Sequence, residues 1–213
     1  TPMAQRIAIV DYGMGNLRSV QKALAHVAPS AAIAITADPG AILAADRVVF
    51  PGQGAMPDCM KCLAASGLGE AVREAASSKP FLGLCIGLQM LFERSDEGDT
   101  PGLAILPGEI LAFSRAEPTR QARLKIPHMG WNEAWQARPH PLWKGIADGA
   151  RFYFVHSFYC VPREESLTAA VSRYPHAFTS AISRDNIFAT QFHPEKSSAA
   201  GLTLLENFSN WTP

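Results

Sequence analysis

The sequence lacks the features of membrane, secreted and nucleic-acid-binding proteins. Its 213 residues contain no apolar run of 18 residues, and no basic segment followed by an apolar one opens the chain. Lys plus Arg and Asp plus Glu both total 19, so the zero net charge gives no general attraction to nucleic acid or anionic membranes. We therefore expect a cytoplasmic protein that binds neither. With 47% hydrophobic residues, one compact domain over residues 1–213 is expected.

Cysteine is scarce, and its positions argue against disulfides and against a metal site. Without a secretory signal, Cys59, Cys62, Cys85 and Cys160 are expected to be reduced thiols. Cys59 and Cys62 form a C-x-x-C pair, but no second such pair or H-x-x-H completes a tetrahedral zinc site. Since the pair does not directly follow a strand, as redox motifs do, we interpret it as one face of a helix and expect no metal.

The first part of the chain alternates between strand and helix patterns, which predicts a parallel sheet. Expected strands are residues 6–10, 32–36, 47–50 and 81–84, and expected helices are residues 17–27, 39–45 and 68–76. The loop at residues 11–15 has the first two glycines of a dinucleotide motif. Arg18 stands where the third glycine belongs, so no dinucleotide cofactor is expected.

Beyond residue 93 strands dominate, which predicts an antiparallel extension of the sheet. A turn-rich segment covers residues 95–108. The strands expected after it are residues 110–113, 131–135, 151–159, 168–171, 177–183 and 187–191. The chain then ends in a loop and an amphipathic helix with apolar residues at 202, 205 and 208.

Cys85 lies where a short apolar strand pattern meets a helical pattern that begins at Ile86 and continues to Phe92. Gly83 and Gly87 flank it as G-x-C-x-G, a cysteine version of the nucleophile elbow, in which small neighbours let the nucleophile project from a tight turn. The following helix N-terminus favours the thiolate, and the Ile86 N–H lies where an oxyanion would form. The alternative is a buried structural cysteine.

A cysteine nucleophile needs a base, and that base needs an orienting partner. His193 and Glu195 offer this pair, because Pro194 disfavours a helical start and the i, i+2 spacing puts both side chains on one side of an extended segment. The segment follows a strand, so it can lie beside Cys85. The turn at residues 51–54 also follows a strand, at the edge where α/β sheets place ligands.

Together, GLCIGLQ around Cys85, PGQG at 51–54 and HPE at 193–195 resemble the class I (triad-type) glutamine amidotransferases over essentially the whole chain. The resemblance implies a three-layer, flavodoxin-like α/β fold: a parallel sheet with an antiparallel extension. DYGMGN, PHMGWN, YFVHSFY and HPEKS are similar to the glutaminase subunits of imidazole glycerol phosphate synthases, which act in histidine biosynthesis.

The resemblance also implies roles for individual residues. Cys85 would attack the carboxamide carbon of glutamine, His193 would move the proton, and Glu195 would orient His193. The Ile86 N–H and the Gly52–Gln53 peptide would form the oxyanion hole, and in the family that peptide can need to turn over before it donates. Gln53 departs from the small apolar residue usual there.

Further implied roles concern substrate and partner, and no cofactor is implied. Gln89, Ser157 and Phe158 would hold glutamine. A separate (β/α)₈-barrel cyclase subunit would form a heterodimer with this chain and receive the ammonia. The candidate contacts to that barrel are Met129, Trp131 and Lys196.

Three alternatives remain open from the residues. The chain could be the glutaminase of another amidotransferase, such as an anthranilate or pyridoxal phosphate synthase. It could be a stand-alone cysteine hydrolase, or a catalytically silent regulatory subunit, although an intact Cys-His-Glu set argues against the last.

Overall fold

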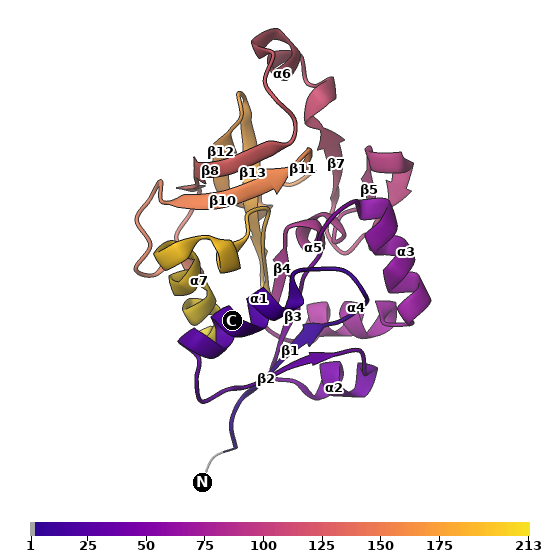
Figure 1. Ribbon diagram of the computed structural model, residues 1–213, viewed down its shortest axis with the longest axis vertical. Coiled ribbons are helices and arrows are strands. Elements are labelled where there is room, and N and C mark those ends of the chain that lie inside the picture. The colour runs from indigo at the N-terminus through magenta and orange to yellow at the C-terminus, as the bar shows by residue number, and fades with distance from the viewer. Residues whose placement is uncertain (1–2) are drawn as a thin grey trace.

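The computed structural model describes residues 3–213 (Figure 1). The helices are α1 (Leu17–Val27), α2 (Pro39–Ala44), α3 (Met56–Ser66), α4 (Gly69–Ser78), α5 (Ile86–Gln89), α6 (Glu117–Ala122) and α7 (Ser198–Asn210). The strands are β1 (Arg6–Val10), β2 (Ala32–Thr36), β3 (Arg47–Phe50), β4 (Phe81–Leu84), β5 (Arg94–Ser95), β6 (Thr100–Pro101), β7 (Gly108–Ala112), β8 (His128–Glu133), β9 (Trp135–Gln136), β10 (Arg151–His156), β11 (Phe158–Pro162), β12 (Thr168–Arg173), β13 (Ala177–Arg184) and β14 (Ile187–Thr190). Short 3₁₀ helices are η1 (Glu97–Asp99), η2 (Phe113–Arg115), η3 (Pro141–Trp143), η4 (Glu165–Leu167) and η5 (Pro194–Lys196).

The main sheet is parallel on one side and antiparallel on the other. Strands β2, β1, β3, β4 and β14 pair in that order and run parallel, and β13, β11 and β7 continue the sheet with antiparallel pairs. Helices α1 and α7 lie together on one face, while α2, α3 and α4 lie on the other (Figure 1). The predicted fold class, a three-layer parallel sheet with an antiparallel extension, is confirmed.

The central strands are apolar on both sides because helices cover both faces of the parallel half. All four residues of β3 and all four of β4 are buried. One buried cluster packs α3 and α4 against the sheet around Phe50 and Phe81, and a second packs α1 and α7 around Phe188 and Phe208. The described residues contain no helix long and apolar enough to cross a membrane.

The continuous strand predicted at residues 151–159 is wrong. The chain breaks at Ser157: β10 pairs with β8 in a separate two-stranded sheet, and β11 pairs with β7 in the main sheet. The Ser157 carbonyl accepts a hydrogen bond from the Phe113 N–H, 3.2 Å away, at the point where the chain passes between the sheets. An unbroken apolar pattern cannot reveal such a change of partner.

The helix after Cys85 is shorter than its apolar spacing predicts. It ends at Gln89 because the carbonyls of Met90 and Leu91 accept hydrogen bonds from Leu103 and Ile105, at 2.8 and 2.9 Å. The turn-rich segment thus takes the carbonyls that a longer helix would use. Helix α6, which comes between the strands expected at 110–113 and 131–135, was not predicted.

Candidate active site

Three neighbouring strands bring the predicted site residues to one edge of the sheet. Strand β4 pairs in parallel with β3 on one side and with β14 on the other. Because parallel strands end at the same edge, the loops after them meet there. These loops carry the 51–54 turn, Cys85 and His193.

Cys85 lies on a strained turn between β4 and α5. Its φ and ψ angles are 54° and −111°, a conformation that residues with side chains rarely adopt. Its N–H donates to the Thr190 carbonyl at 2.8 Å, which ties the turn to β14. A Cβ atom added to Gly87 would lie 2.1 Å from the Phe50 carbonyl oxygen, and one added to Gly52 would lie 2.7 Å from the Gly87 nitrogen. Glycine is therefore needed at position 87 of the elbow and at position 52 of the turn, because the two segments pack in direct backbone contact.

His193 and Glu195 form a buried pair. Nδ1 of His193 lies 2.7 Å from Oε1 of Glu195, and the two side chains are only 2% and 1% exposed. The N–H of His193 donates to the Tyr153 carbonyl at 2.9 Å, which fixes the backbone. Within residues 3–213 Nε2 of His193 has no partner in hydrogen-bond geometry, and His193 and Cys85 line the same cavity.

Neighbouring charged groups have a larger net effect on the pKa of His193 than burial has. Burial alone would lower its pKa, but the Cys85 thiolate and the Glu195 carboxylate together outweigh burial and raise the pKa to about 10. The raised pKa favours the protonated imidazole of His193 at neutral pH. By linkage, the raised pKa of His193 contributes stability that is fully present below the unfolded histidine pKa and is lost as the pH rises through about 10.

Replacing Glu195 with Gln should reduce glutamine hydrolysis less than replacing His193 with Ala. A neutral amide still holds the ring but does not stabilise the imidazolium. We expect the His193→Ala loss in turnover to exceed the Glu195→Gln loss by roughly 100-fold, the ratio typical of such triads. A histidine NMR titration of Glu195→Gln should also show a lowered His193 pKa, and equal losses of turnover would contradict the assigned roles.

The predicted oxyanion hole is closed in this structure. The Ile86 N–H donates to the Gly52 carbonyl at 3.3 Å, so the Gly52–Gln53 peptide directs an acceptor, not a donor, to this point. Two further bonds hold the turn: the Tyr12 hydroxyl donates to the Pro51 carbonyl at 2.7 Å, and the Cys59 thiol donates to the Gln53 carbonyl at 3.3 Å. Turning the 52–53 peptide over would free the Ile86 N–H and aim the Gln53 N–H toward the site.

A cavity of about 330 Å³ lies beside the nucleophile. Of the predicted site residues, its lining contains Gln53, Cys85, Ile86, Gln89, Ser157, Phe158 and His193. Gly52 and Glu195 are not among its lining residues. Gln89 is a buried lining residue, and in the described part of the chain its Oε1 has no hydrogen-bond partner, so an acceptor is left for a ligand donor. A larger hollow of about 620 Å³ lies elsewhere, beside Tyr159 and Arg163, and contains none of the triad.

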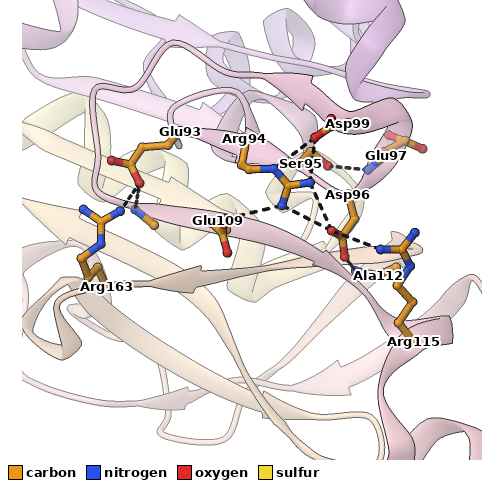
Figure 2. Close-up of polar contacts among 11 residues, drawn as sticks. Glu93, Arg94, Ser95, Asp96, Glu97, Asp99, Glu109, Ala112, Arg115 and Arg163 are labelled. Carbon is orange, nitrogen blue, oxygen red and sulfur yellow. Dashed lines mark hydrogen bonds and ion pairs between the residues drawn. The ribbon is translucent and has the colours of Figure 1, made fainter.

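Glu97 was missed by the sequence interpretation, although it lines the cavity. Burial raises its pKa, partly opposed by the Met56 N–H, which donates to Oε1 at 2.7 Å at the start of α3. Figure 2 shows what fixes its loop: the Arg94 guanidinium points at three carboxylates. These belong to Asp96, Asp99 and Glu109, at 3.4, 3.0 and 3.5 Å. The only sequence signal was an acidic run in a turn.

The three candidate partner contacts are all on the surface. Met129 and Trp131 are 61% and 48% exposed on β8, and Lys196 is exposed on η5. On the same face of the β8–β10 sheet, Val155 is the register partner of Met129 and also lines the cavity. An exposed apolar face therefore borders the nucleophile directly.

The C-x-x-C pair lies on helix α3, and all four cysteines are free thiols. Cys59 is buried and Cys62 is partly exposed. Within residues 3–213 no group of three or more His, Cys, Asp or Glu side chains could hold a metal ion.

Comparisons with known proteins agree with this geometry. The family model described as "Glutamine amidotransferase class-I" matches residues 8–210. A glutamine amidotransferase of known structure superposes with a TM-score of 0.67 at 17% identity, covering 95% of this chain and 98% of that one. The chain belongs to the class I glutamine amidotransferase family and is an enzyme.

Two relatives have names that identify a particular amidotransferase subunit. The protein of Aromatoleum aromaticum is 60% identical over 97% of this chain and 99% of its own length, and it is named imidazole glycerol phosphate synthase subunit HisH. A protein of the same name in Thiobacillus denitrificans is 58% identical over 99% of this chain and 93% of its own length.

Proposed function

We propose that this chain is the glutaminase subunit of an imidazole glycerol phosphate synthase. It hydrolyses glutamine to glutamate and ammonia through Cys85, His193 and Glu195. It passes the ammonia to a (β/α)₈-barrel cyclase subunit, which makes imidazole glycerol phosphate and aminoimidazole carboxamide ribotide in histidine biosynthesis. One observation carries the catalytic part: His193, whose Nδ1 lies 2.7 Å from Oε1 of the buried Glu195, lines the same cavity as Cys85.

In this proposal the reaction begins from the ion pair. The Cys85 thiolate attacks the carboxamide carbon and forms a tetrahedral oxyanion, and the His193 imidazolium then gives its proton to the leaving ammonia. Water, deprotonated by His193, hydrolyses the thioester and releases glutamate. Glu195 keeps Nε2 of His193 directed at the reacting atoms throughout.

Charge complementarity supports an orientation for glutamine in the cavity. The Glu97 carboxylate and the unpartnered Oε1 of Gln89 are both acceptors, so they suit the α-ammonium group. Ser157 and Phe158 would then take the carboxylate end, which leaves the carboxamide beside Cys85. Glu97 joins the predicted residues in this proposal.

The exposed face of the β8–β10 sheet supports the proposal that this chain binds a partner subunit. Met129 and Trp131 present apolar surface there, and Lys196 adds a charge near the triad. We assign this face to the cyclase subunit in a heterodimer. Ammonia released at Cys85 would then enter the partner without crossing bulk water.

The cytoplasm is the proposed compartment, and residues 1–213 are proposed to act as one domain. The nucleophile and three further cysteines are free thiols. An oxidising compartment would expose the catalytic thiolate to oxidation, which the cytosol prevents.

Reconstitution tests the proposal. The chain should co-purify one-to-one with the cognate cyclase and support glutamine-dependent formation of imidazole glycerol phosphate. An active glutaminase that binds an anthranilate or pyridoxal phosphate synthase partner instead would contradict the subunit assignment. Full glutamine turnover without any partner would favour a stand-alone hydrolase.

A further inference from the structure

Behind the candidate site, two buried histidines join β8 to the nucleophile through hydrogen bonds. Nδ1 of His128 lies 2.8 Å from Nε2 of His156, and Nδ1 of His156 lies 2.7 Å from the Phe158 carbonyl. Nδ2 of Asn132 lies 3.2 Å from Nε2 of His128. The two rings are 4% and 5% exposed, and neither belongs to the triad.

The geometry assigns the proton in each hydrogen bond of this series, which runs from Asn132 through His128 and His156 to the Phe158 carbonyl. A carbonyl only accepts, so Nδ1 of His156 carries the hydrogen, and in the neutral ring Nε2 is then an acceptor. Nδ1 of His128 must therefore donate to it, which leaves Nε2 of His128 as an acceptor for the Asn132 amide. The Asn132 amide nitrogen is fixed independently, because it also donates to the Arg173 carbonyl at 2.9 Å.

Surrounding groups keep both rings neutral. Burial lowers the pKa of His128 to about 4 and that of His156 to about 3, against a weaker opposing effect of the Phe158 carbonyl on His156. Tyr174 stacks on His128 with ring centres 4.2 Å apart, and Phe113 packs edge-on against His156 at 5.2 Å. The tautomers assigned above are therefore maintained at neutral pH.

The series continues from the Phe158 carbonyl to the sulfur of Cys85. Nε2 of Gln89 donates to this carbonyl at 3.3 Å and to Oε1 of Gln191 at 3.0 Å. Nε2 of Gln191 in turn lies 3.8 Å from Sγ of Cys85. Gln89 uses its nitrogen twice, and among the described residues its oxygen has no hydrogen-bond partner.

We propose that His128 and His156 are positioning residues whose directional hydrogen bonds fix Gln89, Gln191 and the Cys85 sulfur from the inner side of β8. This inference deepens the proposed function and rests on it. Met129 and Trp131 project from the opposite face of the same strand, so a partner that shifts β8 would act on the first bond of the series.

Two substitutions at each histidine separate this role from a merely structural one. An Asn amide can place a donor near the position of Nδ1, whereas a Gln amide reaches only the position of Nε2. In the complex with the cyclase we expect His156→Gln and His128→Gln to lower kcat/KM for glutamine about 10-fold. We expect His128→Asn to stay within about 3-fold of the unsubstituted chain, whereas His156→Asn, which keeps the donor to Phe158 but removes the acceptor for His128, should lose as much as His128→Gln.

Combining the two Gln substitutions should cost no more than His156→Gln alone, because both break one series of bonds. Equal losses for Asn and Gln at His128, or losses that multiply in the double variant, would overturn the proposal. Thermal unfolding of every variant identifies any loss that follows stability alone, and such a loss would also count against it.

A measurement on the unsubstituted chain needs no activity. Nitrogen-15 NMR at pH 7 should find both histidines neutral with the hydrogen on Nδ1. A hydrogen on Nε2 of His156, or a charged ring, would overturn the inference even in an active enzyme. Absence of glutamine hydrolysis in the unsubstituted complex would instead refute the proposed function.

Discussion

Replacing Cys85 with Ala should abolish glutamine hydrolysis, with a loss of at least about 1,000-fold in turnover. The thiolate forms the covalent bond in the proposed reaction, and no other cysteine lines the cavity. Alanine is smaller than cysteine and fits the buried turn. Glutamate release by the Cys85→Ala chain, measured in the complex with the cyclase, checks this result.

The same variant also tests the division of labour. Added ammonia should restore synthesis of imidazole glycerol phosphate, because the proposed cyclase chemistry needs only the released ammonia. Cys62→Ala is a matched control, since Cys62 lies on α3 outside the cavity and should retain turnover. A folded Cys85→Ala complex that added ammonia cannot rescue would contradict the proposal.

The position of the site was predictable because it depends on local patterns and on strand order. The apolar runs at 47–50 and 81–84 predicted buried strands of the parallel half, whereas 187–191 was expected in the antiparallel extension; β14 instead pairs in parallel with β4, and the loops after these three strands carry the glycines, Cys85 and His193. Parallel strands end at one edge, so adjacency of these loops follows from topology alone.

Features that depend on distant partners were not predictable. The break at Ser157 arises because Phe113, from another part of the chain, bonds its carbonyl. Glu97 reaches the cavity only because Arg94 and the start of α3 hold its loop. The closed oxyanion hole is a choice between two orientations of one peptide, and the residues PGQG are compatible with both.

Glutamine hydrolysis by the isolated chain should be slow and should rise roughly 1,000-fold when cyclase and its nucleotide ligand bind. The Ile86 N–H already donates to the Gly52 carbonyl at 3.3 Å. The Gln53 N–H is not aimed at the site until the 52–53 peptide turns over, so the isolated chain lacks both oxyanion donors. One such donor is worth about 3 to 4 kcal/mol in other hydrolases. A 1,000-fold rise needs about 4 kcal/mol, so recovery of these donors is sufficient even after the cost of turning the peptide over.

Glutamate release should be measured from the isolated chain, the binary complex and the nucleotide-bound complex. Cys59→Ala removes a thiol bond that holds the closed turn, worth about 0.5 to 1 kcal/mol, so it should raise the isolated chain's rate about 2- to 5-fold. Cys62→Ala, one helical turn further along α3, should leave that rate unchanged. A high rate in the isolated chain that the partner does not alter would show that the closed turn does not limit hydrolysis.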